Sequence, residues 1–103
     1  MIVINAKIHS DESSIAAMKE AIVAMVEASL QEDGCEDYNF SVEINDPTVM
    51  RITERWVSEE ALKAHFATPH MAAFQKAMQA HPPKGMELRC YDAKDIPMPD
   101  MGR

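Results

Sequence analysis

The hydrophobic repeat of residues 49–74 changes partway along the segment, and this change constrains the fold more than any other feature. Residues 49–57 alternate with a period of two, which is typical of a strand. Residues 58–67 then repeat with the period of a helix. Thr68 and Pro69 favour a new helix start, because threonine caps a helix and proline fits its first position. The segment therefore predicts a strand followed by two helices.

The rest of the chain alternates between the same two periods. Further strands are predicted at residues 2–9, 36–44 and 86–92. The alternation of the last strand predicts that Met86, Leu88 and Cys90 face the core.

Two connections are also predicted. The apolar positions from Ile15 to Leu30 indicate a helix of about five turns, ending near Gly34, which suits a left-handed cap. The run Asn-Asp-Pro-Thr at residues 45–48 is typical of a turn.

This order of elements, β-α-β-β-α-β, predicts an α+β, ferredoxin-like fold with an antiparallel sheet and helices on one face. We expect a single domain over residues 1–103, with an extended tail at 95–103. Two helices cover only one face, yet Val3 and Val49 place apolar side chains on the other. We therefore expect an exposed apolar face that a second copy covers, giving a homodimer through the sheet face, a dimeric α+β barrel.

Charge and composition exclude several classes of function. The formal net charge is −7, from 17 acidic and 10 basic residues, and no basic patch is present, so nucleic acid is not an expected partner. No apolar stretch is long enough to span a membrane, and no signal peptide is recognised. Cys35 and Cys90 lack the spacing of a redox pair and are expected to be free thiols. The expected location is cytoplasmic.

Three motifs carry a resemblance to a known family. They are Glu54-Arg55-Trp56, then Ala64-His65 with Thr68-Pro69-His70-Met71, and Glu32-x-Gly34-Cys35 followed by Tyr38. In these the chain resembles the antibiotic biosynthesis monooxygenase superfamily of dimeric ferredoxin-like proteins, above all its small bacterial quinol monooxygenases. The resemblance implies a monooxygenase that uses no cofactor and oxidises a quinol or small dihydroxyaromatic with molecular oxygen.

Oxygenation without a cofactor requires a base, hydrogen bonds to a developing oxyanion, and a dry apolar cavity. His65 is the first candidate for the catalytic base, and His70 is the second. Each also has a non-catalytic interpretation: His65 as a buried structural histidine, and His70 as an exposed residue of the first helical turn.

Four residues are candidates for binding the substrate. Trp56 and Phe74 offer aromatic surface, although Trp56 also suits a core position at the end of a buried strand. Asn5 and Tyr38 offer hydrogen bonds to a substrate oxygen, or are ordinary polar groups of the sheet. Glu54 shares the inward face with Trp56, so it must be paired or protonated, which favours a structural role.

Other activities are weighed against this hypothesis. The haem-degrading branch uses an Asn–Trp–His set, of which only Asn5 is kept, because His65 and Gln75 occupy the other two positions. A branch that isomerises a phosphorylated autoinducer sugar, and a small-ligand-binding dimer without turnover, remain alternatives.

No metal or nucleotide cofactor is expected. His65 and His70 are separated by a helix break, and no carboxylate stands at a ligand spacing from them. No glycine-rich phosphate loop is present in a chain with three glycines.

Overall fold

The computed structural model describes residues 1–102, and its elements follow the predicted order. The strands are β1 (Ile2–His9), β2 (Cys35–Glu43), β3 (Asp46–Trp56) and β4 (Gly85–Asp92). The helices are α1 (Glu12–Leu30), α2 (Glu59–Phe66) and α3 (Pro69–Ala80). The predicted ferredoxin-like α+β fold is confirmed.

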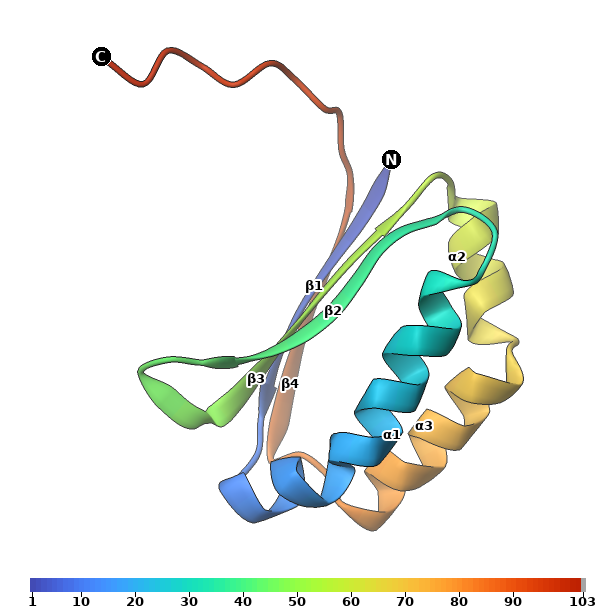
Figure 1. Cartoon of the computed structure of the whole chain (residues 1–103), viewed down its shortest axis with the longest axis vertical. Coiled ribbons are helices and arrows are strands. Elements are labelled where there is room, and N and C mark those ends of the chain that lie inside the picture. Colours follow the sequence, from blue (N-terminus) through green and yellow to red (C-terminus); the bar gives the residue numbers. More distant parts are fainter. Residues whose placement is uncertain (103) are drawn as a thin grey trace.

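The four strands form one antiparallel sheet in the order β2-β3-β1-β4. All three helices lie on the same side of this sheet, and α1 and α3 run alongside each other (Figure 1). The core lies between these layers and centres on Trp56 and Met25, both almost completely buried.

The predicted N-terminal caps of α2 and α3 are present, but the predicted left-handed cap of α1 is wrong. This helix ends at Leu30 with Gln31 as its cap, and Gly34 is left-handed in the loop beyond it. The Ser58 hydroxyl accepts a hydrogen bond from the Ala61 amide at 3.2 Å, and the Thr68 hydroxyl accepts one from the Met71 amide at 3.2 Å. Pro69 occupies the start of α3, as the sequence predicts. The Thr68 hydroxyl also donates to the His65 carbonyl at 2.7 Å, so this residue ties the end of α2 to the start of α3.

The turn between β2 and β3 is shorter than predicted. Only Ile44 and Asn45 lie in the turn, and β3 begins at Asp46. Pro47 fits inside the strand because the β2–β3 ladder is irregular at this point and needs no amide from it. The Asp46 carboxylate instead accepts hydrogen bonds from the Thr48 amide and hydroxyl at 3.1 and 2.6 Å.

The prediction that Met86, Leu88 and Cys90 face the core is correct for the side of the sheet, but these residues are not buried. They share the helix-side face with Ile4, since Ile4 pairs with Cys90 across β1 and β4. However, β4 is an edge strand, and no helix makes substantial contact with it. Leu88 is therefore 63% exposed.

The open face of the sheet is also more polar than predicted. A groove on this face is lined by Asn5, Lys7, Arg51, Thr53, Glu87, Arg89 and Tyr91, among other residues. Val49, one of the apolar residues assigned to this face, is buried within the chain itself at 4% exposure. The part of the open face that this groove covers is therefore mainly polar.

Beyond β4, residues 93–102 have no regular secondary structure and run away from the body of the domain (Figure 1). The extended tail was predicted from residue 95 to residue 103, and Arg103 lies outside the described residues. Among the helices of residues 1–102, none is long and apolar enough to cross a membrane.

Candidate active site

A largely apolar cavity of about 570 Å³ lies between the helices and the β1–β4 side of the sheet. Its apolar lining is Ile4, Ile8, Ile52, Leu62, Phe66, Met71, Phe74, Met78, Met86, Leu88 and Cys90. Its polar lining is Tyr38, Glu54, Gln75 and Arg89. The cavity exists because β4 extends the sheet past the helices, so the residues of β4 that were predicted to be core form one wall.

Glu54 places a buried carboxyl group on the cavity wall. The residue is 8% exposed, and its Oε1 accepts a hydrogen bond from Trp56 Nε1 at 3.0 Å. Burial raises the pKa of Glu54, and this effect outweighs the Trp56 hydrogen bond and the nearby His65, which lower it. Glu54 is therefore a better proton acceptor than an exposed glutamate.

Tyr38 contributes the second polar group of this wall. Its ring meets Trp56 edge to face, with centroids 6.4 Å apart, and lies 5.3 Å from the ring of His65. Burial and the nearby Glu54 carboxylate raise the pKa of the Tyr38 hydroxyl, and this outweighs the effect of the nearby Ser29 side chain, which lowers it. The hydroxyl therefore stays protonated near neutrality and can donate a hydrogen bond.

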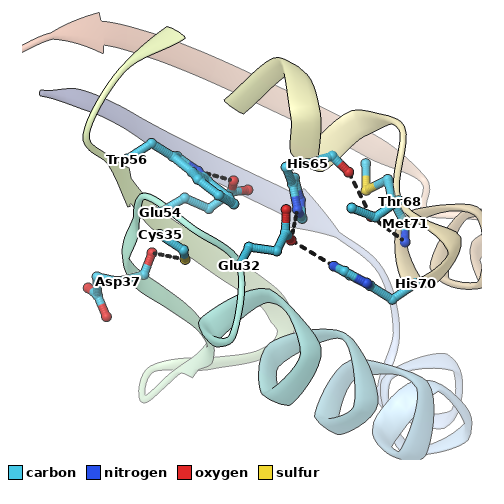
Figure 2. Close-up of polar contacts among 9 residues, drawn as sticks. All are labelled: Glu32, Cys35, Asp37, Glu54, Trp56, His65, Thr68, His70 and Met71. Atoms are coloured by element: carbon cyan, nitrogen blue, oxygen red, sulfur yellow. Dashed lines mark hydrogen bonds and ion pairs between the residues drawn. The ribbon is translucent and has the colours of Figure 1, made fainter. Parts of the chain in front are cut away.

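Behind this wall, three residues from distant parts of the sequence form a hydrogen-bonded cluster (Figure 2). Glu32 Oε2 lies 2.6 Å from His65 Nδ1 and 2.7 Å from His70 Nε2. The exposed fractions of the side chains are 1% for His65, 13% for Glu32 and 23% for His70. The cluster thus leads from the buried interior towards solvent.

Gly34 allows Glu32 to reach the two histidines. Its φ is +81°, and a Cβ at this position would lie 2.7 Å from Val57 Cγ2 and 2.8 Å from Ala61 Cβ. The Gly34 carbonyl also accepts a hydrogen bond from the Val57 amide at 2.8 Å. The loop between α1 and β2 can therefore pack directly against the start of α2 only because residue 34 has no side chain.

The surroundings of His65 define its hydrogen-bonding roles. A carboxylate accepts only, so Nδ1 donates to Glu32. The other ring nitrogen, Nε2, is buried and has no hydrogen-bond partner within the described structure. The ring is packed against Trp56, with centroids 4.7 Å apart. Neutral His65 therefore carries a free acceptor lone pair on Nε2.

The cluster also corrects the expectation that no carboxylate accompanies the two histidines. Glu32, His65 and His70 bring three atoms of metal-ligand type within 4.8 Å of one another. Ligand atoms of a tetrahedral zinc site lie roughly 3.3 Å apart when each bond is about 2.0–2.1 Å long. The observed 2.6 and 2.7 Å are hydrogen-bond distances, so the arrangement as it stands fits a paired carboxylate.

The residues predicted from sequence fall in three places. Tyr38 and Phe74 line the cavity. Trp56 and His65 lie directly behind its wall, with exposures of 0% and 1%, so neither presents a ring to the cavity surface. His70 lies on the outer side of Glu32.

Asn5 does not join the other candidates, because it lines the groove on the opposite face of the sheet. Conversely, sequence reasoning assigned no function to Glu32 and a structural role to Glu54. The signal for Glu32 was its place in the quoted Glu32-x-Gly34-Cys35 motif, and the signal for Glu54 was an acidic residue at an inward strand position.

Comparisons with known proteins bear on the family and the fold. The family model described as antibiotic biosynthesis monooxygenase matches residues 1–77. A solved structure described as an antibiotic biosynthesis monooxygenase is 25% identical, with a TM-score of 0.81, over 92% of this chain and 100% of its own. A comparison with curated proteins finds no match.

Two further solved structures are similar to this chain. A protein from Deinococcus radiodurans is 23% identical, with a TM-score of 0.86, over 95% of this chain and 97% of its own. A conserved protein of unknown function from Bacteroides thetaiotaomicron is 28% identical, with a TM-score of 0.78, over 87% of this chain and 94% of its own. Such high structural similarity at low identity shows a shared fold.

Proposed function

This chain belongs to the antibiotic biosynthesis monooxygenase family, and from that membership we propose that it is a monooxygenase that needs no cofactor. Its substrate in this proposal is a quinol or small dihydroxyaromatic, and its oxidant is molecular oxygen. The observation that carries the proposal is an apolar cavity of about 570 Å³ with a single buried carboxyl group, Glu54, on its wall.

The size and lining of the cavity suit a small aromatic molecule. Its volume falls in the range of roughly 300–1,000 Å³ that is common for small-ligand sites. Phe74 offers ring contacts, and the thioethers of Met71 and Met78 make favourable contacts with aromatic rings. Leu88 and Phe66 on the cavity wall are 63% and 54% exposed, so water is kept from reactive oxygen intermediates only when the bound substrate covers this side.

The two polar groups of the inner wall supply the proton chemistry. Glu54 takes a proton from a substrate hydroxyl, since its raised pKa makes it a stronger base than a solvated glutamate. The Tyr38 hydroxyl donates a hydrogen bond to the resulting oxyanion. The electron-rich anion then gives an electron to molecular oxygen. His65, the base suggested by the sequence, stands one layer behind Glu54.

A sugar-phosphate isomerase is less well supported by the cavity. Phosphate recognition favours clustered arginine or lysine. Arg89 is the one basic residue in the lining of the cavity, and it also lines the groove on the open face, where it is paired in register with Asn5. Arg51 lines that groove too and pairs with Glu43 at 2.6 Å. A binding protein without turnover would use the same cavity, so activity must be measured.

The decisive experiment is oxygen uptake by chelator-treated protein with a panel of hydroquinones, corrected for unaided oxidation. We expect uptake above the enzyme-free rate and a loss of about 10²-fold or more in kcat for Glu54→Gln. Glu20→Gln removes an exposed carboxylate on α1 and serves as the matched control. Full activity in Glu54→Gln would remove Glu54 from the mechanism. No uptake with any quinol would refute the oxygenase, and thermal stabilisation by a ligand would then identify a binding protein.

We also propose that the protein is a homodimer formed through the open face of the sheet. This face holds a groove of about 410 Å³, and Tyr91 at its edge is 48% exposed. A second sheet packed there would bury Tyr91 and enclose Asn5. Light scattering coupled to size exclusion measures the mass directly, and a monomer at micromolar concentration would refute the proposal.

A further inference from the structure

The Glu32–His65–His70 cluster lies behind the cavity and has no role in the steps described above. We propose that Glu32 makes His65 the proton store of this active site, and that His70 positions Glu32 rather than acting as a base. This inference rests on the proposed oxygenase function and assigns roles within the same site.

His65 has a buried ring nitrogen without a partner among the described residues. Nearly all buried polar groups in proteins have hydrogen-bond partners, so an orphaned buried nitrogen calls for an explanation. Nε2 of His65 is such a group, and the ring that carries it is only 1% exposed. We explain it as a lone pair that gains its partner, a proton, only during turnover.

Glu32 supplies a negative charge beside His65. A fully buried imidazolium is costly unless it is paired with an opposite charge. Glu32 Oε2, at 2.6 Å from Nδ1, is that charge, and it holds the proton of neutral His65 on Nδ1. The same carboxylate therefore directs the incoming proton to Nε2 and stabilises the cation once it forms.

The two histidines differ in their position relative to Glu32 and the cavity. His70 Nε2 points at Glu32 from the solvent side and is occupied by its hydrogen bond of 2.7 Å (Figure 2). Neither His65 nor His70 is among the residues that line the cavity, but His65 packs against Tyr38, which does line it. His70 is therefore on the wrong side of Glu32 to receive a proton from substrate, and its contribution is to fix the carboxylate.

The groups around His65 are consistent with this division. The titratable groups near the His65 ring are Glu32, His70, Glu54 and Tyr38. Cys35 lies close to Glu32. Within residues 1–102, no lysine or arginine forms an ion pair with Glu32 or with Glu54. The ring of His65 therefore lies near two carboxyl groups that no lysine or arginine of the described residues pairs with.

The proton steps balance without loss or gain. The O–H bond of the substrate breaks, and its proton binds the Glu54 carboxylate. The Glu54 carboxyl group then turns from Trp56 towards His65, and the proton passes to Nε2, giving an imidazolium beside Glu32. The substrate anion passes one electron to molecular oxygen, and the two radicals join through a new C–O bond to give a peroxide anion. The Nε2 proton returns by way of Glu54 to the outer oxygen atom of this peroxide. The O–O bond then breaks, and the outer oxygen leaves as water with the returned proton and the hydrogen of the ring carbon that bears the peroxide, so the quinol is oxidised to a hydroxyquinone. The Nδ1 proton never leaves His65, so the starting tautomer is restored.

The test compares kinetics in four variants of the full-length protein. Glu32→Gln should lower kcat by about 10²-fold with little change in KM, because the amide keeps the shape but cannot stabilise the cation. His70→Asn keeps an N–H donor and should lose less than about fivefold, whereas His70→Leu should lose about tenfold or more. His81→Asn replaces an exposed histidine and is the matched control. Circular dichroism confirms that each variant is folded.

A substrate-free measurement keeps this inference separate from the proposed activity. Nitrogen-15 NMR of the imidazole rings should show His65 as a single Nδ1–H tautomer in the wild-type protein. In Glu32→Gln the His65 signal should shift towards a mixture of tautomers, since the charged acceptor is gone.

Each outcome decides the inference. If His70→Asn is as inactive as His70→Leu, His70 is a base and the inference is wrong. If Glu32→Gln keeps its kcat, Glu32 has no role in proton storage. If no quinol supports oxygen uptake, the proposed function fails, but the NMR result still decides whether Glu32 controls the tautomer of His65. A mixture of tautomers at His65 in the wild-type protein overturns this role of Glu32. A pure Nδ1–H form that is lost in Glu32→Gln supports it.

Discussion

Replacing Gly34 by alanine should destabilise the whole domain, although the change adds one methyl group at a surface loop. Gly34 has a φ of +81°, a conformation that is unfavourable for residues with a side chain. The new Cβ would also lie 2.7 Å from Val57 Cγ2 and 2.8 Å from Ala61 Cβ. Both contacts are shorter than van der Waals contact, so the loop must move away from α2.

The two effects add because they arise from different causes. A left-handed backbone costs an L-residue roughly 1–2 kcal/mol. Overpacking by one methyl group typically costs about 1–3 kcal/mol, and here Ala61 sits on a helix that cannot yield easily. We therefore expect Gly34→Ala to lower the free energy of unfolding by about 2–5 kcal/mol. For a domain of this size, that corresponds to a fall of at least about 10 °C in Tm.

Urea denaturation followed by circular dichroism measures this loss. Gly85→Ala is the matched control, because its Cβ would meet only His9 Cδ2 at an ordinary 3.7 Å and its φ lies outside the left-handed region. The control should change the free energy of unfolding by less than about 1 kcal/mol. If Gly34→Ala is as stable as this control, the close approach of the loop to α2 is not as described, and the placement of Glu32 loses its support.

The remaining predictions concern two ionisable groups. The pKa of Glu54 is higher in the folded protein than the ordinary 4.5, so its contribution to stability is present below about pH 4.5 and is lost as the pH rises through the folded pKa. Above pH 4.5 the free energy of unfolding, measured in urea, should therefore fall less steeply with pH in Glu54→Gln than in the wild-type protein. An equal dependence on pH in both proteins would contradict the raised pKa. Burial also raises the pKa of the Cys35 thiol to about 11, whereas Cys90 is exposed. At pH 8 a thiol reagent should modify Cys90 in a fast phase and Cys35 only slowly, and Cys90→Ser should abolish the fast phase. Equal rates for both thiols would show that Cys35 is not protected.

Sequence reasoning succeeded where the physical determinant is local. Thr68 and Pro69 define a helix start through their own hydroxyl group and ring, and the structure has that start at the same residue. The left-handed conformation of Gly34 was likewise predictable, because glycine is the residue that tolerates it. Alternation correctly assigned Glu54 and Trp56 to one inward face of β3.

The period of a strand does not reveal what lies above it. Met86 and Leu88 were assigned to the correct face of β4, but their exposure depends on whether a helix reaches the edge of the sheet. That outcome follows from strand order and helix length together. The cavity therefore appears only in three dimensions.

The sequence by itself determined the elements of this protein, the faces of its strands and, through its motifs, its family. The tertiary structure decided which polar groups meet. Glu32 and His65 are 33 positions apart, and their contact depends on how closely the α1–β2 loop approaches α2, which no local propensity encodes. The orphaned nitrogen of His65 and the buried carboxyl group of Glu54 are likewise consequences of packing, because burial is a property of all neighbouring elements at once.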